Sequence, residues 1–229
     1  MCIVLLTDYN LLWWLLQERS FQFIIFFSNL AFIINVVCSS SKRHDELQAI
    51  ELDGITLLLE MGELETDKGK NQIGTLKRVG DTRWSSHFYS ICSMMKIYNS
   101  SCLVLQKIIV DGSTYSQRGD VDATFNMLSS FEFILILHMM KEIMGITGSL
   151  CQALQKQSQD ILNAMQLVCS TKILIQKLRE DGWKNLLKGV VFFCEQHDID
   201  IPDFNSTYVA RHGRSRHKKI MSLWNIILG

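Results

Sequence analysis

An arginine and a tryptophan stand next to each other at the predicted start of a helix. The stretch 80–86 opens with a Gly-Asp turn signal and continues with Thr82, a residue type favoured at helix N-caps, before Arg83 and Trp84. A planar guanidinium can hold a phosphate through two parallel hydrogen bonds, and a large aromatic ring can stack on a nucleobase. Taken alone, such a pair is more typical of a core tryptophan beside a solvent-facing arginine. The residue types leave both interpretations open.

A second basic group lies near the C-terminal end of the chain, without a compensating acid. Its arginines and lysines are Arg211, Arg214, Arg216, Lys218 and Lys219. Such a cluster can contact the phosphates of a nucleic acid or serve as a nuclear-import signal. A solvated tail has the same composition, and the sequence favours neither interpretation.

Composition bounds the fold more tightly than the function. The chain has 229 residues, of which 48% are hydrophobic, enough to bury one sizeable core. It contains one proline, and its apolar residues recur with the period of a helix almost throughout. We therefore predict an all-α helical bundle. Lys and Arg together number 23, as do Asp and Glu, so any binding to nucleic acid must come from local patches rather than from net charge.

The cysteines, histidines and aspartates do not predict a metal site or a catalytic centre. The seven cysteines are widely spread and form no C-x-x-C, which is typical of small buried side chains in a reducing compartment. Cys194 and His197 have the spacing of half a zinc site, but a packed core pair is favoured because no second pair follows. His138 lies on an apolar helix and is predicted to be a core histidine. Five aspartates fall at predicted helix starts or breaks, where capping accounts for them: Asp81, Asp111, Asp120, Asp122 and Asp181.

The spacing of apolar residues predicts a series of helices. We expect them at about 21–38, 41–62, 87–110, from Asp120 or Asp122 through residue 137 to a kink at Gly145 and Gly148, then 158–180 and 183–197. Asp181-Gly182 is expected to break the chain between the last two helices.

The first of these helices has two interpretations. The run 21–38 is almost wholly apolar and approaches the length of a membrane span. A buried core helix is favoured because amide side chains interrupt the run and Lys42-Arg43 follows at once. A membrane-tethered protein stays as the alternative.

Beginning with Thr82-Arg83-Trp84-Ser85-Ser86, the chain resembles the hAT-type transposase-like proteins. These include proteins named zinc finger MYM-type protein 1-like, which carry a TTF-type zinc finger far upstream. The resemblance covers about residues 26–219, and its specificity comes from the combination of short motifs. Besides the first motif these are KRHDEL at 42–47, NQIGTL at 71–76, DG at 111–112, QRGD at 117–120, SFEF at 130–133, QDILNAM at 159–165, REDGW at 179–183, IDIPD at 199–203 and GRSR at 213–216.

The resemblance implies a division of the chain. Residues 1–25 are an unmatched apolar segment, and 26–79 correspond to a helical remnant of the end of a ribonuclease H-like region with its linker. Residues 80–203 correspond to the helical insertion domain of such a transposase, and 204–229 to a basic tail with an unmatched apolar end. The catalytic sheet would be largely missing. In relatives the tryptophan of the first motif packs against a base flipped out near the transposon end, so Trp84 inherits that role and Arg83 a supporting one.

The resemblance also implies that this chain lacks catalysis. Intact relatives hold a divalent metal with an Asp-Asp-Glu set, and neither the first two aspartates nor the final glutamate is matched here. We therefore expect a truncated, catalytically inactive hAT transposase-like protein in the nucleus, without a cofactor of its own. Its remaining role would be DNA binding or protein association, including homo-oligomer formation. The alternatives are a subunit or fragment of an active DNA transposase and a membrane-tethered helical protein through 21–38. A membrane is the less favoured partner.

Overall fold

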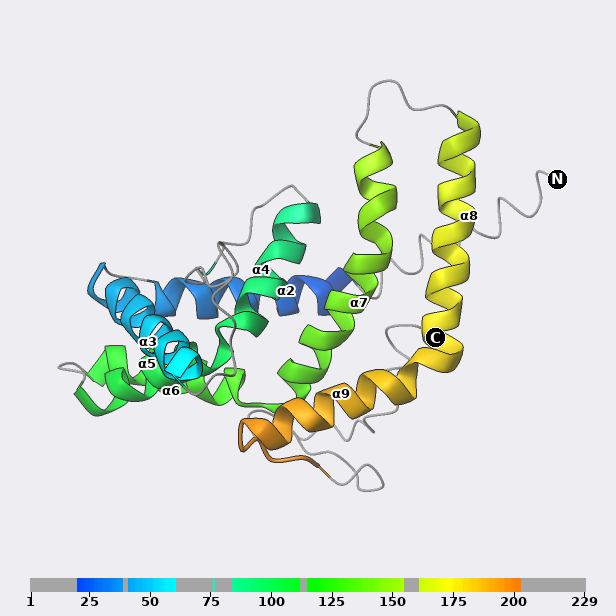
Figure 1. The fold of residues 1–229 in the computed structure, drawn as a ribbon. Helices are drawn as coiled ribbons and strands as arrows, with labels where there is room; N and C mark the ends of the chain where they lie inside the picture. The colour runs from blue at the N-terminus through cyan, green and yellow to red at the C-terminus, as the bar shows by residue number, and fades with distance from the viewer. Residues whose placement is uncertain are drawn as a thin grey trace.

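The described part of the chain is helical. The computed structural model describes residues 20–38, 41–60, 76, 84–111, 115–154 and 161–202, and every regular element within these ranges is helical (Figure 1). The predicted all-α class is confirmed there, and the arrangement resembles a bundle. In chain order the helices are α2 (Ser20–Val37), α3 (Ser41–Glu60), α4 (Trp84–Lys96), α5 (Tyr98–Asp111), α6 (Tyr115–Leu128), α7 (Phe131–Leu154), α8 (Ile161–Lys177), the π-helical η1 (Leu178–Gly182) and α9 (Trp183–Gln196).

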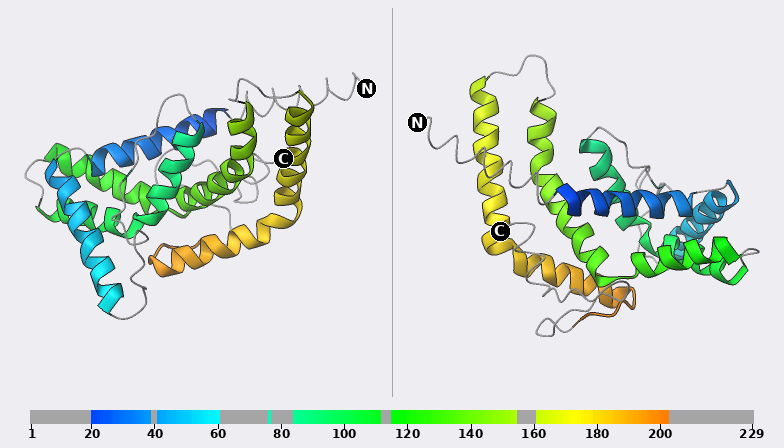
Figure 2. Two further views of the ribbon diagram at one scale, coloured as in Figure 1. Left: turned by 45° about the horizontal axis from the view of Figure 1, so that its top comes forward. Right: turned by 180° about the vertical axis from the view of Figure 1, so that it is seen from behind.

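Helix α7 is the centre of the bundle. It contacts α4, α6, α8 and α9, and α2 and α3 join the bundle through α5 and α6. Its first half is buried because apolar side chains point to most sides of it. Figures 1 and 2 show α2, α3, α5 and α6 gathered at one end of the molecule. At the other end α7 and α8 run antiparallel and side by side, and α9 returns beneath α7.

Helix α2 forms part of the core on one side only. Phe26, Leu30 and Ile33 are buried, as the core interpretation predicted, whereas Ile24 and Phe32 are exposed. Within the part of the chain that the structure describes, residues 131–153 are the one helix long and apolar enough to cross a membrane alone. The segments 24–37 and 41–56 meet that test only as a pair bent by 92°. Residues 131–153 belong to α7, and a central core helix meets the same length and composition test.

The helix predicted over 87–110 is two helices, which meet at Ile97. The hydroxyl of Ser90 donates to the carbonyl of Ser86, and that of Ser93 donates to the carbonyl of Ser90, both at 2.9 Å. Serine hydroxyls that bond back to the preceding turn compete with the backbone ladder and bend helices. The bend lets α4 pack on α7 while α5 packs on α6, with Ile97 buried at the corner.

The helix predicted to start at Asp120 or Asp122 is also two helices. Helix α6 begins earlier, and α7 starts after a turn that ends at Ser130. The hydroxyl of Ser130 accepts the backbone N–H of Phe133 at 3.3 Å and donates to the carbonyl of Met127 at 2.8 Å. Ser130 is therefore the N-cap of α7. The helix from there runs without interruption through Gly145 and Gly148.

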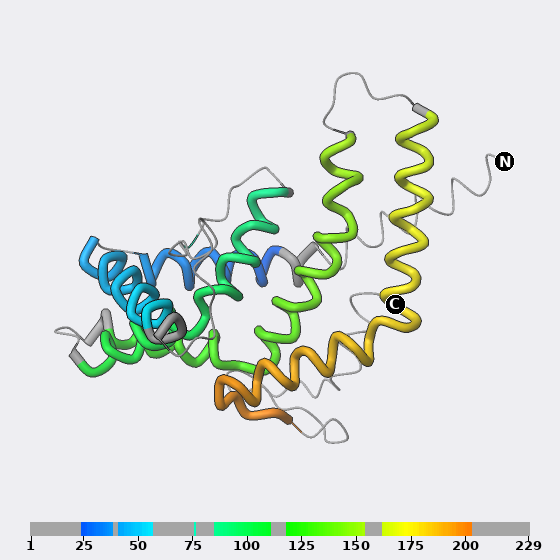
Figure 3. Tube along the Cα trace, in the orientation of Figure 1, coloured from blue at the N-terminus to red at the C-terminus, as the bar shows by residue number. Residues whose placement is uncertain are grey.

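The predicted break at Asp181-Gly182 is a π-helical corner instead. The helical backbone continues through η1 into α9, and the axis changes direction there (Figure 3). A Cβ atom on Gly182 would lie 2.6 Å from Cδ1 of Leu178, closer than such atoms approach. Leu178 packs against the core. The absence of a side chain at position 182 thus lets Leu178 keep its place inside the corner.

Replacing Gly182 by alanine should destabilise the protein by about 1 kcal/mol, because the new methyl group forces Leu178 to move. Gly189→Ala is a matched control, since a Cβ there meets nothing within 4 Å. Alanine is the better helix former, so the control should gain roughly 0.5–1 kcal/mol. Urea denaturation followed by circular dichroism measures both. Equal stabilisation by the two substitutions would contradict this account of the corner.

Candidate binding site at the start of helix α4

Of the candidate binding residues singled out from the sequence, the structure describes only the backbone of Trp84. Trp84 is the first residue of α4, so the predicted helix entrance is confirmed to within a residue or two. Its side chain lies outside the described part of the structure, as does the whole of Arg83. The same holds for the basic cluster Arg211, Arg214, Arg216, Lys218 and Lys219. The roles assigned to these side chains stay predictions.

A cavity of about 180 Å³ lies directly beside this helix entrance. One wall comes from the first turns of α4 and consists of Ser85, Phe88 and Tyr89; the other comes from α7 between residues 144 and 152. Pockets that enclose drug-sized ligands measure roughly 300–1,000 Å³. The cavity is therefore suited to a single ring system rather than to a large cofactor.

Two glycines of α7 keep the cavity open. Gly145 and Gly148 lie one turn apart, and both line the cavity. A Cβ atom at position 145 would meet Cε2 of Phe88 at 3.9 Å, an ordinary contact, whereas one at position 148 would meet nothing within 4 Å. A glycine inside a helix costs about 1 kcal/mol relative to alanine. A side chain at position 148 would fill part of the cavity. Gly148 leaves that space empty, at this cost in helix stability.

The walls combine aromatic and polar groups. The rings of Phe88 and Tyr89 have centroids 6.2 Å apart, and Tyr89 is 51% exposed. Hydroxyl groups come from Ser85 and Ser149, and an amide that can both donate and accept comes from Gln152. The arrangement can stack on a flat ring and hydrogen-bond to its edge. The N-terminus of α4 adds backbone N–H groups that attract an anion.

The chemistry of this site suits binding better than covalent catalysis. Cys151 is the thiol that lines the cavity. Burial raises the pKa of Cys151, so the unreactive thiol form dominates near neutral pH.

Helix α4 is held in place by a contact with α2, because the ring of His87 packs on Phe27 of α2 with centroids 4.3 Å apart.

The predicted core role of His138, Cys194 and His197 is confirmed. The ring of Phe193 packs on His138 at 5.1 Å and on His197 at 4.4 Å, and Tyr98 packs on His197 at 4.7 Å. These rings join α5, α7 and α9. The Nδ1 atom of His138 bonds to the carbonyl of Ile134 at 2.9 Å, and Cys194 is fully buried. Among the described residues, no three His, Cys, Asp or Glu side chains lie close enough together to hold a metal ion.

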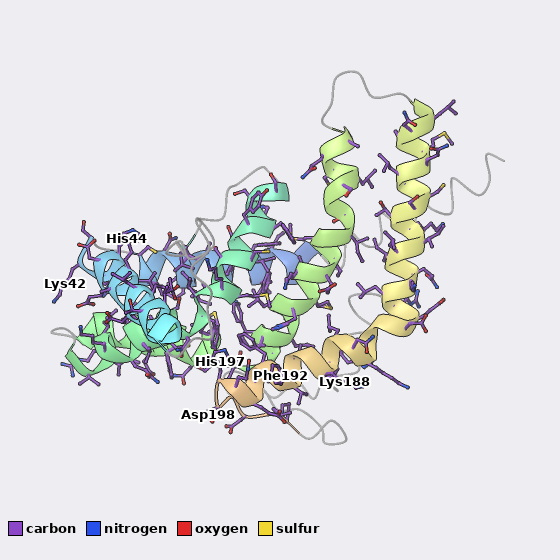
Figure 4. All side chains as sticks on the ribbon, in the orientation of Figure 1. Lys42, His44, Lys188, Phe192, His197 and Asp198 are labelled. Atoms are coloured by element: carbon purple, nitrogen blue, oxygen red, sulfur yellow. The ribbon has the colours of Figure 1, made fainter. Side chains whose placement is uncertain are left out.

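The outer side of α9 carries Lys188 and the exposed Phe192, one turn apart, and His197 lies just beyond the helix end (Figure 4).

The prediction of buried cysteines holds only in part. Cys194 is buried and its pKa is raised to about 11 by burial, whereas Cys169 on α8 is exposed. The prediction for Cys169 was therefore wrong.

Sequence reasoning missed Tyr89, Gly148 and Gln152. The available signal was a pair of glycines one turn apart on a strongly apolar helix, from which the sequence analysis predicted only a kink. The chain matches no protein-family model, no curated protein and no solved structure. The family resemblance therefore rests on the sequence motifs alone.

Acidification should destabilise the docking of α9. Burial lowers the pKa of both His138 and His197 below the ordinary value of 6.5. The unfolded chain then takes up protons more readily than the folded one, so stability is complete above about pH 6.5 and is lost as the pH falls toward the lowered values. The expected result is a lower urea midpoint at pH 5.0 than at pH 7.5.

The variant His197→Phe should reduce this pH dependence, because a phenyl ring keeps the contacts with Tyr98 and Phe193 without titrating. His44→Gln on α3, outside the aromatic cluster, serves as the control and should keep it. If His197→Phe loses as much stability between pH 7.5 and pH 5.0 as the wild type does, the aromatic cluster is not the source of the pH dependence.

Proposed function

We propose that this chain is a helical DNA-binding module of the hAT transposase-like type, which acts in the nucleus by binding rather than by catalysis. The observation that carries the proposal is the cavity between α4 and α7, one residue from Trp84. The part of the sequence that resembles the family's DNA-contacting motif therefore begins the helix that forms one wall of the cavity.

An unpaired nucleobase fits this site in size and chemistry. It is a flat ring system with hydrogen-bonding edges, and the cavity offers Tyr89 for stacking and Gln152 for edge contacts. Stacking on an aromatic side chain contributes about 1–3 kcal/mol per base. Trp84 would supply a second ring at the entrance, and Arg83 with the start of α4 would hold the adjoining phosphate.

The basic cluster from Arg211 to Lys219 would supply the remaining affinity. The chain has no net charge, so attraction to the DNA backbone must come from such a local group. Contacts with phosphates release bound counterions and weaken as the salt concentration rises. The module would thus read an unpaired base through α4 and hold the backbone through the cluster.

The proposed module binds DNA without catalysing phosphoryl transfer, because the matched motifs contain no catalytic carboxylates. In-line phosphoryl transfer by two metals depends on a set of carboxylates that hold the ions. The motifs that carry the resemblance bring none of the three acids of the family's catalytic site. The chain would therefore recognise DNA without cutting it.

Filling the cavity should weaken binding to DNA that carries an unpaired base. We expect Gly148→Leu and the double variant Arg83→Ala, Trp84→Ala each to reduce affinity by about 5- to 150-fold, the equivalent of about 1–3 kcal/mol for one stacked base. Fluorescence anisotropy at low salt with a hairpin that bears one unpaired base measures the effect. A fully paired duplex should bind Gly148→Leu and the wild type equally.

The control for this experiment is Gly119→Leu on α6, where an added side chain also meets open space. It should leave affinity for the hairpin unchanged. Circular dichroism checks that each variant is as helical as the wild type. Equal affinity of Gly148→Leu and the wild type would rule out the cavity as the base-binding site.

A further inference from the structure

The cavity beside the start of α4 continues along the line where α4 and α7 pack together. The two helices lie side by side and run in opposite directions (Figure 1). In each helix four residues spaced by three or four positions fall within an arc of about 60° at 3.6 residues per turn. These two stripes begin at the cavity, and we call them together the seam: Ser85, Tyr89, Cys92 and Lys96 on α4, and Gln152, Gly148, Gly145 and Lys141 on α7.

The two helices keep one antiparallel register along the seam. A Cβ atom on Gly145 would meet Cε2 of Phe88 at 3.9 Å, so these two positions are neighbours beside the cavity. One turn further along each helix, Cys92 and Lys141 are also neighbours: burial raises the pKa of the Cys92 thiol, and the positive charge of Lys141 opposes that rise. The two contacts are four residues apart on both helices. The cavity and Lys141 therefore lie on the same line of contact.

The end of the seam away from the cavity is basic. Lys96 is exposed and Lys141 is half-buried, and none of the seam residues is acidic. Glu142 follows Lys141 in sequence, but at 3.6 residues per turn it lies about 160° from Met144, a residue of α7 that lines the cavity. Its carboxylate is therefore on the outer side of α7, away from α4. The seam joins an aromatic and hydrogen-bonding end to a positively charged end.

We propose that the seam binds a short single strand of DNA that continues from the unpaired base, with Lys96 and Lys141 at its phosphates. This strand site rests on the proposed function, because the cavity holds the base from which the strand continues. Gly148 and Lys141 are separated by about 10 Å along the axis of α7, and Tyr89 and Lys96 by the same distance along α4. Successive nucleotides of one DNA strand are about 3.4 Å apart along the helix axis. The seam is therefore long enough for about three stacked nucleotides.

A single strand suits the seam better than a duplex does. Proteins that bind single strands combine a positively charged track for the backbone with aromatic side chains that stack on the bases. The seam has both, because Tyr89 is 51% exposed at one end and the two lysines lie at the other. Each lysine can bind a phosphate as a point charge. In a duplex the bases are stacked and paired inside the helix, so a ring on the protein surface cannot stack on them.

Fluorescence anisotropy with the full chain in about 50 mM salt tests the seam. One probe is the hairpin with one unpaired base, and two others add three unpaired nucleotides to that base, on its 5′ or its 3′ side. The wild type should bind one of the extended hairpins about fivefold or more tightly than the one-base hairpin, the gain from at least one phosphate contact. Lys96→Gln and Lys141→Gln should each weaken that binding by about 5- to 10-fold and lower the slope of log affinity against log salt by about 0.7, the value for one single-strand phosphate. Both variants should bind the one-base hairpin like the wild type.

Lys188→Gln is the matched control, because it removes an exposed lysine of α9 outside the seam and should bind every probe like the wild type. Circular dichroism checks that each variant keeps its helicity. Lysine variants that bind the extended hairpin like the wild type, a wild type that gains nothing from the added nucleotides, or an equal loss in Lys188→Gln would each overturn the strand site and leave the base site intact. A wild type that does not prefer the one-base hairpin to a fully paired duplex would overturn the proposed function, and the strand site with it.

Discussion

The burial of α7 is the constraint on which the rest of this structure depends. A helix with apolar side chains on most of its circumference has no stable place in water, and each fully buried Leu, Ile or Met side chain contributes about 1.5–3 kcal/mol. Four helices cover α7, from different directions along its length. Its one histidine in that region, His138, is accommodated because its ring bonds to the preceding turn and packs on Phe193.

The same packing explains why an open site exists at all. Protein interiors are close-packed, so gaps between helices are rare. A gap can form where a side chain is absent at the contact between two helices. Along its second half α7 exchanges large residues for Gly145 and Gly148, at the level where the first turns of α4 pass. The gap forms because these two glycines have no side chains, while burial fixes the rest of the helix in place. The aromatic wall on α4 is fixed in turn by the contact of His87 with Phe27.

The sequence was sufficient for the class of fold because helical periodicity is a local signal. It predicted the start of α4, the extent of α9 and the core role of His138. It failed at Ile97, Ser130 and the η1 corner, where hydroxyl–backbone bonds and the fit of Leu178 against Gly182 decide the path of the chain. The cavity could not be predicted, because Tyr89 and Gly148 are far apart in sequence and only tertiary packing brings them together.

The corner at η1 joins the antiparallel pair of α7 and α8 to the docking of α9. Helix α8 is held on one side by α7 and at its end by η1 and α9. The docking of α9 beneath α7 depends on the rings of Tyr98, Phe193 and His197. The cavity lies on the α4 side of α7, which burial holds rigid. A change in the aromatic cluster should thus loosen α9 while leaving the cavity in place, because no residue of α9 lines the cavity.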